Sequence, residues 1–217
     1  MTGTPDCRFT RNFQASGIEQ SQGWILVAMQ RLLSRLLAFA FLTAFSFSLG
    51  AAAPPDVGQK APDFALQSMD GLSVQLSQLT QRSPVVLVVL RGYPGYDCPY
   101  CQRQVRDFVQ KAKDFAAAGV QVTFIYPGPP DELKMRANSF LADKDFPKSF
   151  LMLLDPGYTF TNLYGLRWDA PQETAYPSTF LIDQTGTVFF SKTVKSHSDR
   201  MGAQEVLDQL RSRKMVR

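Results

Sequence analysis

The alternation of apolar and polar side chains predicts a series of strands. Residues 72–76 alternate apolar with polar positions, as a strand with one buried face does. Residues 85–90 are continuously apolar and rich in β-branched side chains, which is the pattern of a strand buried on both faces. Further strands are predicted at residues 120–126, 150–154, 179–182 and 187–190. The last two flank a turn that contains Gly186, so we expect them to form a hairpin.

Helical periodicity follows the second predicted strand. Apolar residues recur at helical spacing from Val105 to Ala116, which predicts one long helix that ends at Gly119. Further helices are predicted at residues 131–141, 160–164 and 203–210. Strands that alternate with helices and close in a hairpin predict an α/β fold, with a mixed central sheet and helices on both faces. We expect one such domain, spanning residues 54–217.

The N-terminal region contains the three parts of a secretory signal peptide. Arg31 and Arg35 supply the positive charge, residues 36–49 form an uncharged apolar run, and small residues follow at 50–53. The apolar run is short for a membrane span, which needs about 20 residues. We expect residues 1–53 to be an N-terminal extension and signal peptide, with translation starting at Met29. The alternative is an uncleaved anchor, which would be the only membrane contact. Either reading places the domain outside the cytoplasm, for example in the periplasm.

Charge and cysteine content narrow the possible functions. From residue 54 onward the chain has 19 basic and 17 acidic residues, a net charge of +2, and no basic stripe, so nucleic-acid binding is not expected. Cys98 and Cys101 are the only cysteines of the predicted domain, since Cys7 lies in the extension. Export brings the pair into a compartment where disulfides persist. A domain stapled by disulfides would carry more cysteines, spread along its length. The pair therefore favours redox chemistry.

The position of Cys98 suits a reactive thiolate. It follows a buried strand and a loop and begins the long predicted helix, whose free N–H groups favour a negative charge. Such settings lower a cysteine pKa from about 8.5 to roughly 3.5–7.5. We expect Cys98 to attack and Cys101, one turn deeper, to resolve the adduct. Asp97 opposes the thiolate charge, and Arg91 and Arg103 are candidates to offset it.

Other roles for the pair stay open. A zinc site needs about four ligands, and the chain offers only His197 and Cys7 in addition. A permanent structural disulfide and an unreactive pair are also compatible with the spacing. We expect no metal and no prosthetic cofactor, and we expect His197 to be a surface residue.

The motifs together resemble a known superfamily. With the run Cys98-Pro99-Tyr100-Cys101 after a strand, and the later segment 176–186, the sequence resembles the thioredoxin superfamily. Within it, the chain is similar to the redoxin branch that contains AhpC/TSA peroxiredoxin-like proteins and exported TlpA-type thiol reductases. The opening segment 57–64 and the closing segment 196–200 are also similar to that branch. The resemblance implies a thioredoxin-like fold in which Pro177 is cis and packs against the cysteines, and the backbone of Tyr176 pairs with the incoming substrate.

The resemblance also implies a function. It indicates a thiol-dependent oxidoreductase without a cofactor, whose partners are protein or small-molecule thiols and disulfides. The alternative is a thiol peroxidase that reduces hydroperoxides through Cys98. Peroxidatic sites usually carry Thr or Ser where Gly95 stands, and thioredoxin-like reductases usually carry Trp where Asp97 stands. Of the two, disulfide exchange fits better. A copper-binding protein of the Sco type would have a longer cysteine spacing, and only its distal histidine has a counterpart, His197.

Overall fold

Five consecutive aliphatic residues form the central strand of the sheet. In the computed structural model, which describes residues 52–215, all five residues of β3 (Val85–Val89) are buried. The strand pairs in parallel with β4 (Gln121–Gly128) and antiparallel with β6 (Ser178–Ile182). Because a neighbour lies on each side, β3 has no free edge, and its β-branched side chains pack on both faces of the sheet. The strand predicted at 85–90 is confirmed.

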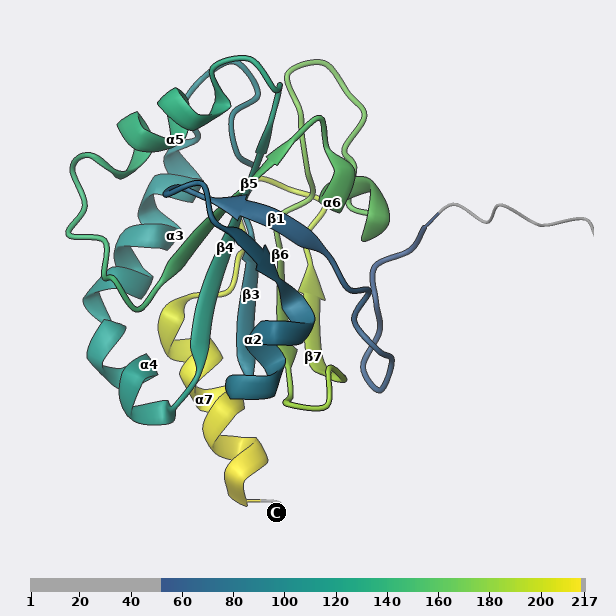
Figure 1. Ribbon diagram of the computed structural model, residues 1–217, viewed down its shortest axis with the longest axis vertical. Helices are drawn as coiled ribbons and strands as arrows, with labels where there is room; N and C mark the ends of the chain where they lie inside the picture. The colour runs from purple at the N-terminus through teal and green to yellow at the C-terminus, as the bar shows by residue number, and fades with distance from the viewer. Residues whose placement is uncertain (1–51, 216–217) are drawn as a thin grey trace, which may run out of the picture. The chain divides into compact units, whose positions relative to one another are not determined.

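The sheet has seven strands in the order β2-β1-β5-β4-β3-β6-β7 (Figure 1). Strands β3, β4 and β5 run parallel, and every other pairing is antiparallel. The remaining elements are β1 (Ala65–Ser68), β2 (Ser73–Gln75), α2 (Leu76–Arg82), α3 (Pro99–Gln110), α4 (Ala112–Ala118), α5 (Leu133–Leu141), β5 (Leu151–Pro156), α6 (Thr159–Leu163), β7 (Val188–Thr193) and α7 (Ala203–Met215). The predicted α/β fold with a mixed sheet is confirmed.

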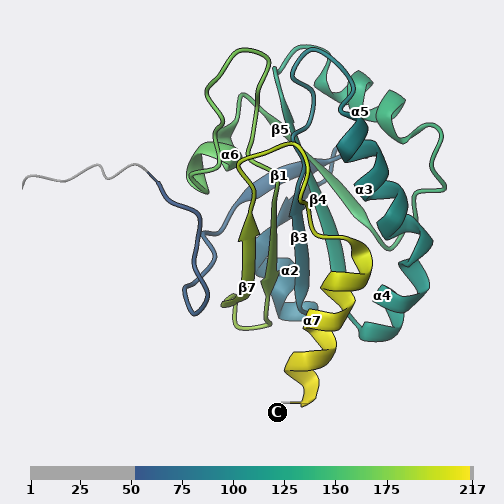
Figure 2. The same ribbon diagram turned by 180° about the vertical axis from the view of Figure 1, so that it is seen from behind.

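Alternate residues of β3 belong to two separate hydrophobic cores. Val86 and Val88 pack with apolar residues of α3, α4, α5 and α7. Leu87 and Val89 point to the other face and pack with residues of α2 and α6. The two views of the ribbon show these two groups of helices on opposite faces of the sheet (Figures 1 and 2). Both cysteines of the Cys-Pro-Tyr-Cys run belong to the first core.

The helix predicted after the cysteines is in fact two helices. Lys111 ends α3 and begins α4, with φ −99° and ψ 13° outside the helical region. In a straight helix, Phe108 and Phe115 would stand about 10 Å apart along the axis. With the break, their rings stack with centroids 5.1 Å apart. Gly119 ends α4 in the left-handed conformation, φ 69°, as the sequence predicted.

Two elements before β3 differ from the sequence-based prediction. Strand β1 was not predicted, and Leu76, predicted as the end of a strand, instead begins α2. The carboxylate of Asp63 accepts a hydrogen bond from the Ser77 backbone N–H at 3.0 Å, which satisfies one of the free donors of this helix. Leu76 and Thr80, one turn apart, are the residues that α2 buries. A local alternation pattern cannot report a cap that comes from 14 residues earlier.

The N-terminal prediction lies almost wholly outside the described residues. The expected extension, residues 1–53, overlaps the described range 52–215 by two residues only. The signal peptide and the role of Cys7 therefore stay predictions. Within residues 52–215, no helix is both long enough and apolar enough to cross a membrane.

Candidate active site

Cys98 lies at the junction between the central strand and α3. It is the N-cap of α3, and its sulfur accepts a hydrogen bond from the backbone N–H of Cys101 at 3.4 Å. Pro99 occupies the first helical position, where a missing N–H leaves no donor unpaired. The sulfur therefore stands at the positive end of the helix dipole, as the sequence predicted for the first residue of the pair.

Both cysteines are free thiols, and they differ in protonation rather than in burial. Cys98 is 1% exposed and Cys101 is fully buried, so the expected difference in depth is slight. The pKa of Cys98 is lowered to about 5, first by a hydrogen bond with the Cys101 thiol and then by the Cys101 backbone N–H and the charge of Arg200. Burial and the neighbouring Cys98 raise the pKa of Cys101. The geometry therefore supports a Cys98 thiolate held by a protonated Cys101.

Arg200 provides the positive charge nearest to the pair. Its Nη1 lies 3.3 Å from Cys101 Sγ, and its Nη2 lies 3.7 Å from Cys98 Sγ. The side chain is held in place because Nε donates to the carbonyl of His197 at 2.9 Å and Nη1 lies 3.4 Å from Gln104 Oε1. Arg200 belongs to the closing segment 196–200, but the sequence indicated no role for it. No local signal links it to a cysteine about a hundred residues earlier.

Arg91 is the predicted candidate that lies near Cys98. Its side chain is 2% exposed, forms an ion pair with Glu173 and donates to the carbonyl of Gln172 at 2.6 Å. A hydrogen bond with Arg91 is the smallest of the main contributions that lower the pKa of Cys98. Arg91 therefore contributes less than Arg200 to lowering the pKa of Cys98.

The other two candidates for tuning the pKa of Cys98 lie at the surface. The guanidinium of Arg103 stands 4.7 Å from the centroid of the Tyr100 ring, and the residue is exposed. Asp97 is also exposed, in the loop before the pair. Neither residue is among the main contributions to the pKa of Cys98.

The predicted substrate-binding pair, Tyr176 and Pro177, is engaged within the chain. The N–H of Tyr176 donates to the carbonyl of Leu166 at 2.9 Å, and its carbonyl accepts from Ser178 Oγ at 2.9 Å. The carbonyl of Pro177 accepts from Val194 N–H at 2.9 Å. No peptide bond between residues 52 and 215 is cis, so the expectation of a cis Pro177 is wrong. Backbone hydrogen bonds on both sides are satisfied in the trans form, which is also the intrinsic preference of an X–Pro bond.

The carboxylate of Glu173 links Arg91 to His197. Glu173 pairs with Arg91 through one oxygen and, through the other, lies 2.8 Å from His197 Nε2. The His197 ring also stands 5.2 Å from Trp168, whose ring stacks on Tyr176 at 4.8 Å. His197 is 39% exposed, so it is a half-exposed residue with a structural partner. Through its carbonyl it also orients Arg200, as described above.

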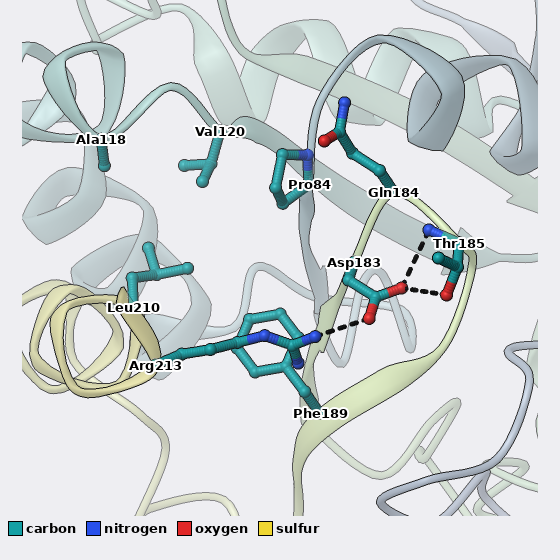
Figure 3. Close-up of a pocket in the computed structure, with 9 residues that line it drawn as sticks. All are labelled: Pro84, Ala118, Val120, Asp183, Gln184, Thr185, Phe189, Leu210 and Arg213. Carbon is teal, nitrogen blue, oxygen red and sulfur yellow. Dashed lines mark hydrogen bonds and ion pairs between the residues drawn. The ribbon is translucent and has the colours of Figure 1, made fainter. Parts of the chain in front are cut away.

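Two hollows flank different ends of the sheet. An open groove of about 410 Å³ lies beside the cysteine pair and is lined in part by Tyr100, Gln104 and Arg200. A second cavity, of about 220 Å³, lies at the opposite end, where Arg213 from α7 crosses the Phe189 ring to reach Asp183 at 2.6 Å (Figure 3). Only the first groove is lined by a residue that contacts the cysteine sulfurs, Arg200, so the redox chemistry belongs to that end.

Among the described residues, no three His, Cys, Asp or Glu side chains gather as metal ligands would.

Comparisons with known proteins agree with this architecture. The profile of the AhpC/TSA family matches residues 57–191. The thiol-disulfide oxidoreductase ResA of Halalkalibacterium halodurans is 24% identical over 183 residues, which is 84% of this chain and 90% of that protein. The putative peroxiredoxin bcp of Helicobacter pylori strain J99 is 28% identical over 163 residues, 71% of this chain and 97% of that protein.

Solved structures show the same fold. Peroxidoxin BcpB from Mycobacterium tuberculosis superposes with a TM-score of 0.58 at 24% identity, covering 73% of this chain and 97% of that one. A peroxiredoxin-like protein from Aquifex aeolicus superposes with a TM-score of 0.61 at 18% identity, covering 75% and 90%. The thioredoxin-like fold expected from the sequence is confirmed.

Proposed function

Because the chain belongs to the AhpC/TSA family of thiol-dependent oxidoreductases, we propose that it is an exported thiol–disulfide oxidoreductase in which Cys98 attacks and Cys101 resolves. The export part of this proposal rests on the N-terminal succession of positive, apolar and small residues. The substrates would be disulfides and thiols of proteins or small molecules, and no prosthetic group takes part in the exchange.

The protonation difference within the pair carries the proposal. A pKa of about 5 keeps Cys98 as a thiolate at neutral pH, and the thiolate is the species that attacks a disulfide. Cys101, whose pKa is raised, keeps its proton and donates a hydrogen bond to Cys98. Two chemically identical side chains therefore enter the reaction in different roles.

The reaction follows from these roles. The Cys98 thiolate attacks one sulfur of a substrate disulfide, forms a mixed disulfide and releases the other substrate sulfur as a thiolate. Cys101 then loses its proton and attacks Cys98 Sγ, so that a Cys98–Cys101 disulfide forms and the second substrate thiolate leaves. Two electrons pass from the pair to the substrate. A reducing thiol reverses the sequence, and the direction of net flow depends on the reduction potentials.

Peroxide reduction is a second candidate, favoured by the burial of the reactive sulfur. Cys98 is 1% exposed, and a small hydroperoxide enters such a site with less rearrangement than a peptide. The Cys98 thiolate would attack the terminal oxygen, leaving a sulfenic acid and releasing an alcohol or water. Cys101 would then displace water and form the same disulfide. The glycine at position 95, in place of a hydroxyl side chain, weighs against this reaction.

Trapping of covalent adducts tests the proposal. We expect Cys101→Ser to accumulate mixed disulfides through Cys98, because the attacking sulfur keeps its nucleophilicity and lacks its resolving partner. Cys98→Ser is the matched control and should accumulate few. Non-reducing gels and intact-mass spectra of both variants, purified from the exported fraction, give the result. Equal adduct levels would overturn the assignment of roles. A sulfenic acid on Cys98 after peroxide treatment, with no mixed disulfide, would replace exchange by peroxide reduction.

A further inference from the structure

The row of residues that begins with the two cysteines continues along α3 as the surface on which a distant loop docks. Cys98, Cys101, Gln104 and Asp107 follow one another at intervals of three residues. Residues three apart on a helix lie on the same face, one above the other. The last three of them contact the segment between β7 and α7 or the first residue of α7. That segment carries Arg200, whose guanidinium contacts both sulfurs.

Gln104 joins α3 to this loop through both ends of its side-chain amide. Nε2 donates a hydrogen bond to the carbonyl of Met201 at 3.1 Å, and Oε1 accepts one from Arg200 Nη1 at 3.4 Å. Gln104 is 7% exposed, and hydrogen bonds are stronger in such a buried setting than in water. Because the bond to Met201 fixes the orientation of the amide, its oxygen is directed at Arg200.

The guanidinium of Arg200 is held at two of its nitrogens, which decides where the third one points. Nε donates to the carbonyl of His197 at 2.9 Å. Nη1 contacts both Gln104 Oε1 and Cys101 Sγ, the latter at 3.3 Å. A guanidinium is planar, so two fixed nitrogens define the position of the third. Nη2 is thereby placed 3.7 Å from Cys98 Sγ.

The groups that hold Arg200 stay the same while the charge on the sulfurs changes. The amide of Gln104 and the carbonyl of His197 are neutral acceptors in every redox state of the pair. During exchange the negative charge belongs first to Cys98 and then to Cys101, when Cys101 loses its proton and attacks. Arg200 lies within contact distance of both sulfurs, so one fixed guanidinium stabilises each thiolate in turn.

We propose that Gln104 is a positioning residue for the exchange reaction, which holds Arg200 between the two sulfurs so that one guanidinium serves both attack by Cys98 and resolution by Cys101. This inference rests on the proposed thiol–disulfide exchange and adds a residue to its machinery. Gln104 acts through Arg200, and its removal leaves the positive charge present but no longer fixed. The effect of its removal should therefore have the same direction as the loss of Arg200 and be smaller.

Gln104→Met tests the inference, because methionine is similar in length and lacks the amide. We expect the titration midpoint of Cys98 to rise by about half a unit, against about one unit for Arg200→Gln. The variant with both substitutions should shift no further than Arg200→Gln alone, because Gln104 acts only through Arg200. Shifts that add in the double variant would overturn the inference. Should Gln104→Met fail to fold, Gln104→Asn replaces it, since its amide is one methylene shorter.

Asp107→Ala is the matched control for loosening the loop. Asp107 accepts a hydrogen bond from the Ala203 N–H at 2.6 Å, so its loss weakens the docking of α7 at a point beyond Arg200. It also removes a negative charge, which by itself favours the thiolate of Cys98. The midpoint of Cys98 should therefore not rise. An equal rise in Asp107→Ala and Gln104→Met would show that loop docking, and not the amide of Gln104, sets the acidity, and would overturn the inference.

Reaction with dithiodipyridine separates attack from resolution. Attack by the Cys98 thiolate releases one thiopyridone, and resolution by Cys101 releases the second. A half-unit rise from a midpoint of about 5 should slow the first release about twofold at pH 5 and little at pH 7.5. The second release should be slower at both pH values, because Arg200 is no longer fixed beside Cys101. Unchanged rates in both steps would overturn the inference while exchange itself stands. Release of no thiopyridone, or of one alone, by the unaltered protein would instead overturn the proposed function.

Discussion

Arg200 Nη2 lies 3.7 Å from the sulfur of Cys98, although 102 residues separate the two along the chain. The loop between β7 and α7 delivers this charge, and the Arg200 Nε bond to the His197 carbonyl keeps it there. The acidity of Cys98 is therefore not a property of α3 alone. It also depends on how this distant loop docks against the N-terminus of the helix.

Removing the Arg200 charge should make Cys98 a weaker acid. We expect Arg200→Gln to move the titration midpoint of Cys98 to higher pH by about one unit, because an opposite charge close to a thiolate favours the ionised form. Arg200→Lys should give a smaller change, since it keeps the charge without the planar fork of donors. Thiolate absorbance at 240 nm, measured against pH, gives the midpoint. Arg106→Gln serves as the control, and an equal change in that variant would contradict the assignment.

The pH dependence of alkylation should identify the reactive thiol. With a pKa of about 5, Cys98 is already a thiolate from pH 6 upward, so its rate of reaction with iodoacetamide should be nearly constant between pH 6.5 and 8. The rate should fall as the pH drops through about 5, where Cys98 gains its proton. Cys101 should stay largely unlabelled, because its pKa is raised and it is buried. Mapping the label by mass spectrometry gives both rates, and preferential labelling of Cys101 would reverse the roles.

Glu173 should matter for folding as well as for the site. Replacing it with Gln leaves the nearly buried guanidinium of Arg91 without its counter-charge, which we expect to lower the free energy of unfolding by about 3 kcal/mol. The matched control is Glu132→Gln, which breaks the solvent-exposed pair with Arg136 and should change stability little. Urea unfolding followed by circular dichroism compares the two variants. Equal losses would mean that burial of the Arg91–Glu173 pair carries no special weight.

The N-terminus of the exported protein should lie between Ala52 and Asp56. The uncharged run at 36–49 and the small residues that follow it place a cleavage site there. Intact mass of the protein recovered from the extracytoplasmic fraction gives the first residue. A protein that retains residues 36–49 would have an anchor instead of a cleaved signal, and recovery from the cytosol alone would contradict export.

The fold was predictable where the signal is local. A run of aliphatic residues at 85–90 fixes a doubly buried strand, and Gly119 supplies the left-handed conformation that ends α4. The start of α2 was missed because its cap comes from the carboxylate of Asp63, in a separate segment. The break at Lys111 was missed because apolar periodicity continues across it, while the backbone angles of Lys111 and the stacking of Phe108 on Phe115 are features of the folded chain.

The site was predictable in part, for the same reason. Cys98, Pro99 and Cys101 lie within four consecutive residues, so the sequence alone could predict the cysteine pair and its position at the start of a helix. Arg200 could not be, because nothing near it in the sequence indicates which residue it faces. Arg103 was a candidate because it is close to Cys98 along the chain, yet its guanidinium lies over the Tyr100 ring and it is not among the main contributions to the pKa of Cys98. Separation along the chain therefore did not indicate which arginine influences the pKa of Cys98.

The division of β3 between two cores has a consequence for how the protein opens. Because its residues alternate between both sets of helices, this strand can separate from its neighbours only when both cores come apart. Its amide hydrogens should therefore exchange with solvent at the rate of global unfolding. The loop that leads to Cys98 begins at the end of β3. The segment that precedes the cysteine is therefore anchored to the strand whose amides we expect to exchange most slowly.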